Sequence, residues 1–188
     1  MRSKYLPFFL IGAFFYSHIG SADGLLRPMY ENKVNEVGLI IQTEQNPEWD
    51  TKVQYVDKQP IFIAETPRNV YPPSVMMIST FDNLQVQKTE LEEIAQSAIE
   101  QSAQNFGVSS ETIKKLKIQP REFKYLKGYE ATFDGVANGE DVTVKVFIGQ
   151  ETNRPVVTLT AYTYRGKISH IKEQLRRSWD NISYLSNK

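Results

Sequence analysis

The side chain best suited to acid–base chemistry in this sequence is His170, because imidazole titrates near neutral pH. The chain has 188 residues, two histidines and no cysteine, and the second histidine, His18, lies in an apolar segment at the N-terminus. A Ser-His-Asp hydrolase would also need an exposed nucleophile on a sharp turn, and the sequence contains no G-x-S-x-G segment. We therefore expect His170 to be a surface or capping residue, and we predict no catalytic residue.

Carboxylates offer a second route to catalysis or metal binding. Residues 134–141 read DGVANGED, which is acidic but lacks the spacing of an EF-hand loop. The Asn138-Gly139 pair within it favours a type I′ hairpin turn instead. With one histidine beyond residue 22 and no cysteine, the sequence predicts no metal site and no cofactor. Adjacent acidic residues such as Glu140 and Asp141 cannot flank a glycosidic bond.

Two proline-containing segments, residues 47–49 and 67–73, combine a restricted backbone with residue types that often carry binding energy. Trp, Tyr and Arg are enriched at the centres of protein interfaces, and loops held by a rigid scaffold commonly carry recognition. The alternative is that the aromatic side chains cover an edge of the sheet. The residues that we expect to contact a protein partner are Trp49, Arg68, Tyr71, Pro72 and Pro73.

Alternating apolar and polar residues predict the strands that would hold these loops. In the first half of the chain, the expected strands are residues 37–42, 52–56, 61–64 and 75–81. In the second half, residues 118–126 are typical of an edge strand, because Pro120 lacks an amide donor. The three strands that follow should form an antiparallel meander with one buried face, at residues 129–134, 142–148 and 157–161.

Two helices are expected to cover this sheet. Apolar residues recur on one face of a helix from Thr89 to Phe106, and Gly107 marks its end. A second amphipathic helix is expected from Ser169 to Tyr184, with Trp179 in its core stripe. The sequence therefore predicts an α+β fold, in which an antiparallel sheet is covered on one face by two main helices. The second face of the sheet would then be free for a partner.

The order of elements in the second half resembles the Mog1/PsbP-like fold, which includes the DcrB-like small bacterial proteins. The resemblance covers roughly residues 50–185. It depends on a helix, a strand that includes Gly128-Tyr129-Glu130-Ala131, two long strands, and a terminal helix that ends Ser178-Trp179-Asp180-Asn181-Ile182. It implies an α/β/α-type sandwich. Because proteins of this group generally act by binding other proteins, it also implies a binding role.

Residues 1–22 have the pattern of a secretory signal peptide. A basic start precedes an apolar stretch, and Gly20 and Ala22 provide the small residues of a cleavage site. The apolar stretch is shorter than the roughly 20 residues that a spanning helix needs. We expect cleavage near Ala22, a flexible arm over residues 23–35, and a single α+β domain over residues 36–188. No later segment is long and apolar enough to span a membrane.

The net charge and the absence of catalytic and metal-binding motifs limit the functions that the sequence predicts. The formal net charge is zero, so binding to nucleic acid is not expected. The sequence predicts a periplasmic or secreted, non-enzymatic module that recognises a protein partner in the bacterial envelope. It would act as a secretion-system accessory, or as an immunity or inhibitor protein. The alternative is a cell-envelope hydrolase that uses carboxylates whose positions the sequence does not indicate.

Overall fold

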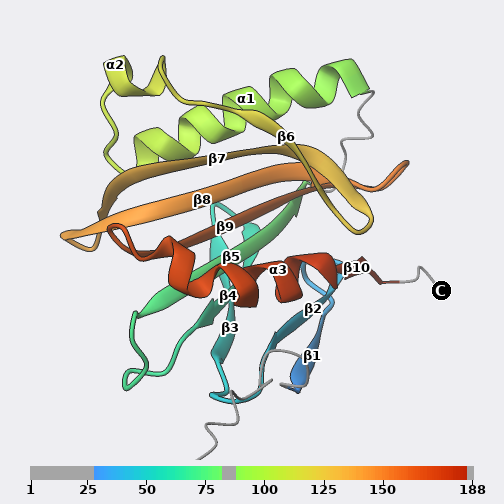
Figure 1. The fold of residues 1–188 in the computed structure, drawn as a ribbon. Coiled ribbons are helices and arrows are strands. Elements are labelled where there is room, and N and C mark those ends of the chain that lie inside the picture. The colour runs from blue at the N-terminus through green and yellow to red at the C-terminus, as the bar shows by residue number, and fades with distance from the viewer. Residues whose placement is uncertain (1–27, 82–87, 186–188) are drawn as a thin grey trace, which may run out of the picture.

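A large antiparallel sheet organises the chain in the computed structural model, which describes residues 28–81 and 88–185 (Figure 1). The predicted signal peptide and residues 23–27 lie outside the described residues. The strand order is β3-β4-β5-β9-β8-β7-β6. The strands are β3 (Asp50–Val56), β4 (Gln59–Glu65), β5 (Ser74–Phe81), β6 (Gln119–Phe123), β7 (Leu126–Ala137), β8 (Glu140–Gln150) and β9 (Val156–Tyr164).

Tight turns fix the register of the long strands. Asn138 and Gly139 have φ angles of 51° and 84°, and Ala137 pairs directly with Glu140. A two-residue type I′ turn requires positive φ at both central positions, as the Asn-Gly pair predicted. The β7–β8–β9 meander and the edge position of β6 are likewise confirmed.

A second, smaller sheet has the order β1-β2-β10, with β1 at Met29–Val34, β2 at Leu39–Glu44 and β10 at Ser183–Tyr184. The expected flexible arm over residues 23–35 is therefore wrong for residues 29–34, and the folded domain begins before residue 36. Two kinds of contact hold β1 in place. The Asn32 amide donates to the Ile41 carbonyl (3.2 Å) and to Thr43 Oγ1 (3.0 Å), and Val34 is buried in the core.

The helices are α1 (Lys88–Asn105), α2 (Ser110–Ile113), the 3-10 turn η1 (Ile168–Ile171) and α3 (Lys172–Asp180). The stop signal at Gly107 is confirmed, since this residue has a φ of 73°. The last helix is shorter than expected. It ends at Asp180 because Ser183 and Tyr184 pair with Ile40 and Leu39 of β2 in place of continuing the helix.

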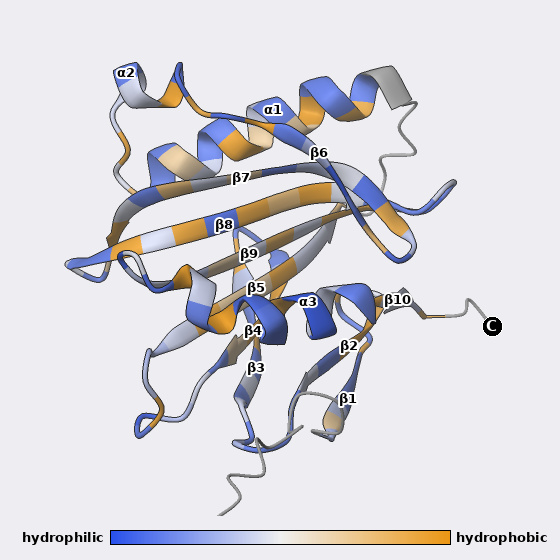
Figure 2. Cartoon of the chain, viewed as in Figure 1, coloured by the Kyte–Doolittle hydropathy of each residue, from blue (hydrophilic) through white to orange (hydrophobic). Residues whose placement is uncertain are grey.

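The two main helices lie on opposite faces of the large sheet, not on one face as expected (Figure 1). Helix α1 packs on β7 and β8, whereas α3 and the small sheet cover the other face. Strand β8 explains this arrangement, because Val144 and Val146 point to α1 while Phe147 points to the core beneath α3. Figure 2 shows that β8 is hydrophobic along most of its length, which is typical of a strand buried on both faces.

The fold is therefore an α+β sandwich, as the predicted class and the implied α/β/α arrangement describe. In the described part of the chain, no helix is both long and apolar enough to cross a bilayer.

Candidate functional site

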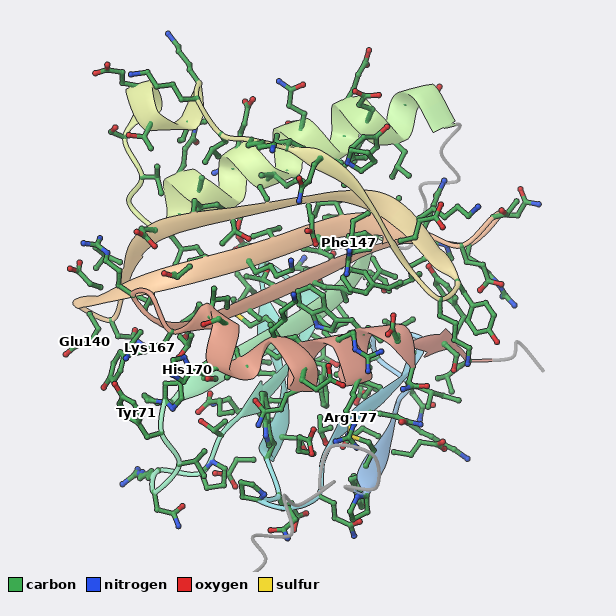
Figure 3. The ribbon with its side chains drawn as sticks, viewed as in Figure 1. Tyr71, Glu140, Phe147, Lys167, His170 and Arg177 are labelled. Atoms are coloured by element: carbon green, nitrogen blue, oxygen red, sulfur yellow. The ribbon has the colours of Figure 1, made fainter. Side chains whose placement is uncertain are left out.

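The loop that joins β4 to β5 carries four of the five residues expected to contact a partner. Arg68, Tyr71 and Pro73 are exposed, and the Tyr71 side chain is 68% exposed. The Tyr71 ring packs against Tyr164, with 6.2 Å between the ring centroids. Pro72 is buried, so it cannot contact a partner directly, and this expectation is corrected. Figure 3 places Tyr71 at the same end of the molecule as His170.

Trp49 was also expected to contact a partner, and its burial shows that it does not. Its side chain is only 5% exposed and belongs to the core that contains Met76, Leu175 and Trp179. The alternative interpretation, in which the aromatic residue covers the sheet, is therefore right for this position. The sequence could not distinguish the two because α3, which packs beside Trp49, follows it by more than a hundred residues.

His170 and the acidic segment at residues 134–141 lie at the surface, as expected. His170 is exposed, and its backbone amide donates to the Lys167 carbonyl (2.9 Å). Arg165 contacts two acidic residues of the 134–141 segment, with 3.7 Å to Asp134 and 3.0 Å to Asp141. The acidic groups of the hairpin thus bind an arginine side chain. Within residues 28–81 and 88–185, no three His, Asp or Glu side chains come together as metal ligands would.

A groove of about 680 Å³ lies between α1 and the large sheet. Helix α1 covers β7 and β8 and leaves the same face of β4, β5 and β9 open. The helix side of the groove is formed by Ile94, Ser97, Ala98, Gln101, Ser102, Asn105 and Phe106. The sheet side is formed by Ile61, Met77, Ser79, Phe81, Thr158 and Thr160. We call this feature the α1 groove.

Small side chains on one stripe of α1 leave room for the groove between this helix and the sheet. One stripe of the helix is buried against β7 and β8, and a neighbouring stripe is only partly buried and faces the groove. Because Ala98 and Ser102 in the second stripe are small, the helix cannot fill the space over β5 and β9. The buried stripe consists of Leu91, Ala95, Ile99 and Ala103.

Strand alternation forms the floor of the α1 groove. Met77 pairs with Thr160, and Ser79 pairs with Thr158, so these four side chains lie on one face of the sheet. None of the described residues that line the groove is ionisable. The groove therefore offers apolar contacts and neutral hydrogen-bonding groups, and the flexible Met77 side chain can adapt to different shapes.

An aromatic cluster marks one end of the groove. The Phe106 ring meets Tyr162 edge-on, with 5.4 Å between the centroids. Burial is the main cause that raises the pKa of Tyr162, and the nearby Glu65 raises it further whereas Lys52 lowers it. The phenol therefore favours its neutral form more strongly than an exposed tyrosine does.

The α1 groove was not expected from the sequence. A whole face of the sheet was expected to be free, whereas α3 and the small sheet cover that face and only part of the α1 face stays open. The signal that was available is the apolar character of Ile61 and Met77. Both residues alternate with core residues in the strands and therefore make a second apolar face.

Comparison with known proteins supports the fold and no more than the fold. No family model and no curated protein matches the chain. A Bacteroides thetaiotaomicron VPI-5482 crystal structure is similar with a TM-score of 0.57 and 9% identity, over 86% of this chain and 50% of that one. This chain thus spans half the length of that protein. The cyanobacterial PsbP (CyanoP) of Synechocystis sp. PCC 6803 gives a TM-score of 0.50 at 8% identity, over 85% of this chain and 94% of that chain.

A third structure, a Pseudomonas aeruginosa protein of unknown function, gives a TM-score of 0.47 at 11% identity, over 85% of this chain and 99% of that one. The likeness to the cyanobacterial protein confirms the PsbP-like fold that the order of elements predicted.

Proposed function

We propose that this protein is an exported, non-enzymatic binding module whose α1 groove receives an apolar segment of a protein partner in the bacterial envelope. The observation that carries the proposal is an open groove of about 680 Å³ whose described lining residues are all uncharged. A secretion-system accessory and an immunity or inhibitor protein are two forms that this role can take.

The size and chemistry of the groove support this role. Ligand sites commonly have volumes of roughly 300–1,000 Å³ and a mainly apolar lining. Each large apolar side chain that a partner buries contributes about 1.5–3 kcal/mol, so two or three such side chains give useful affinity. General acid–base catalysis near neutral pH uses titratable groups, and the described residues that line the α1 groove do not supply them. The chemistry of the groove therefore favours binding over hydrolysis.

Export is the first part of the proposal to test. If residues 1–22 are a cleaved signal, the protein recovered from the envelope of a bacterial host should begin near Asp23. N-terminal sequencing or intact-mass analysis of the periplasmic fraction measures this directly. A chain that starts at Met1 and is recovered from the membrane fraction would contradict cleavage and favour an uncleaved anchor.

The groove is tested by replacing Met77 with glutamate. Because a carboxylate loses its hydration when a partner covers it, we expect Met77→Glu to reduce partner capture from envelope extract at least tenfold. The measurement is a pull-down quantified by mass spectrometry with the wild-type protein in parallel. Val136→Glu is the matched control, since Val136 is an exposed apolar residue on β7 and does not line the groove. This variant should capture the partner normally.

Two further variants separate the alternatives in the same experiment. Tyr71→Ala removes the most exposed aromatic residue of the β4–β5 loop. If Tyr71→Ala loses the partner while Met77→Glu keeps it, the loop is the contact surface and the groove assignment is wrong. His170→Ala should leave the biological activity unchanged. Loss of activity in a folded His170→Ala protein would favour the hydrolase interpretation.

A further inference from the structure

A second cavity, separate from the α1 groove, lies on the opposite face of the large sheet. It has a volume of about 200 Å³ and is enclosed by β6, β7 and β8 on one side and by η1 and α3 on the other. Its inner wall is formed by the partly buried Ile168 and by Phe123, Leu175 and Trp179, which are almost wholly buried. The Phe123 and Trp179 rings meet edge-on, with 5.3 Å between their centroids. The wall is therefore preformed, since both rings are fixed by the core.

Four cationic side chains surround this apolar wall. Arg121 comes from β6, Lys145 from β8, and Lys172 and Arg176 from α3. No carboxylate stands among the described residues that line the cavity. This composition is the opposite of that of the α1 groove, and it favours a ligand that carries negative charge.

The neighbouring carboxylates neutralise only part of this positive charge. Glu130 is buried and is the shared partner of two cations, at 2.8 Å from Lys145 Nζ and 3.8 Å from Arg121 Nε. Its other oxygen accepts from the Gln119 amide (3.2 Å). One carboxylate therefore faces two cations, and one positive charge of this group is not compensated by Glu130.

The two cations on α3, Arg176 and Lys172, also differ in how far carboxylates neutralise their charge. Arg176 is held by Glu173 (2.6 Å) and by Asp180 (3.1 Å). Lys172, in contrast, forms no close ion pair with a carboxylate in the described parts of the chain, although it is one of the cations that lower the pKa of the adjacent Glu173. The positive charge available to a ligand thus comes from Lys172 and from the Arg121–Lys145 pair, which lie across the cavity from each other on α3 and the sheet.

We propose that this cavity binds a small organic carboxylate with an aromatic ring. An apolar protein cavity of roughly 150 Å³ accommodates one benzene molecule, so about 200 Å³ suits a ring with a short carboxylate substituent. The ring lies in the apolar part of the cavity, against the partly buried Ile168 and the small exposed parts of Phe123 and Trp179, where apolar contacts favour it. The carboxylate lies near Lys172 and Arg121, where charge-assisted hydrogen bonds are available.

Phenylacetate is the probe for this site, and phenylacetamide is its uncharged counterpart. The measurement is a titration of the isotope-labelled domain followed by the NMR signal of the Trp179 indole. We expect phenylacetate to shift this signal saturably and phenylacetamide to bind at least tenfold more weakly. Raising the salt concentration should also weaken phenylacetate binding, because salt screens exposed charges.

Single lysine substitutions then test whether the carboxylate of phenylacetate binds near Lys172. Lys172→Gln should weaken phenylacetate binding about fivefold, as expected when one charge-assisted hydrogen bond is lost. Lys58→Gln is the matched control, because Lys58 is an exposed lysine in the β3–β4 turn and does not line the cavity. It should bind phenylacetate as the wild type does, and thermal unfolding verifies that both variants are folded.

Three results would overturn the proposal. The first is no shift of the Trp179 signal at millimolar phenylacetate. The second is equal binding of phenylacetate and phenylacetamide, which would leave only an apolar cavity. The third is an equal effect of Lys172→Gln and Lys58→Gln, which would indicate a general charge effect. Each result is independent of the partner-capture experiment on the α1 groove, so either proposal can be refuted without affecting the other.

Discussion

Replacing Trp179 with alanine is expected to lower the free energy of unfolding by about 3–5 kcal/mol, because removal of a large buried aromatic side chain leaves a cavity in the core. Trp179 is only 1% exposed. Its ring meets Phe123 at 5.3 Å, and its Nε1 group donates to Met76 Sδ at 3.2 Å. The side chain thus joins α3 to the edge strand β6 and to β5, an interior strand of the sheet. Urea unfolding followed by circular dichroism measures the loss.

Trp179→Phe is the control for this prediction. It keeps a ring in the site and should therefore cost clearly less than the alanine variant. For a domain of about 150–250 residues, each kcal/mol corresponds to a change of roughly 2–4 °C in Tm, so the two variants should be well separated by thermal unfolding. An unchanged unfolding midpoint for Trp179→Ala would show that α3 does not dock on the sheet as described.

Replacing Arg177 with methionine is expected to destabilise the fold by a similar amount, about 3–5 kcal/mol, since it removes the cation from a buried ion pair. Arg177 on α3 contacts Glu44 at the end of β2, with 3.1 Å between Arg177 Nη1 and Glu44 Oε1. The Glu44 side chain is only 2% exposed and the Arg177 side chain 17% exposed. Without this cation, the Glu44 carboxylate keeps the cost of burial and loses the attraction of the arginine.

The double variant Glu44→Gln/Arg177→Met should recover much of this stability, because a neutral amide is less costly to bury than a charge. The neighbouring Arg176→Met variant is the matched control. Arg176 also forms ion pairs, with Glu173 and Asp180, but its side chain is half exposed, so its removal should change stability little. Equal instability of the double and single variants in urea unfolding would contradict an origin in the buried carboxylate.

Local patterns in the sequence predicted the elements whose geometry depends on near neighbours. Asn138-Gly139 specified the β7–β8 turn because both residues tolerate positive φ. Gly107 specified the end of α1 for the same reason. Pro120 indicated an edge strand because it has no amide to donate, and β6 does lie at the edge of the sheet. Each of these inferences needed only the residues of one short segment.

The candidate sites could be predicted only in part. Arg68, Tyr71 and Pro73 are exposed in a loop as expected, since their segment contains prolines that exclude a central strand. Trp49 and Pro72 are buried instead. Neither the α1 groove nor the second cavity, on the opposite face of the large sheet, was predicted, because each is formed by elements far apart in the sequence. The groove joins α1 to β4, β5 and β9, and the cavity joins β6, β7 and β8 to η1 and α3.

The sequence by itself determined the class of the fold, the meander of β7, β8 and β9 and the positions of the two main helices, because these follow from residue periodicity and turn chemistry. Tertiary structure decided which face each helix covers. The long-range contacts that decide it include the Leu185 amide donating to the Gly38 carbonyl (2.9 Å) and Arg177 pairing with Glu44 across 133 positions. Such contacts depend on the whole folded chain, and they turn the end of an expected helix into β10, hold β1 in a sheet and leave the α1 groove open.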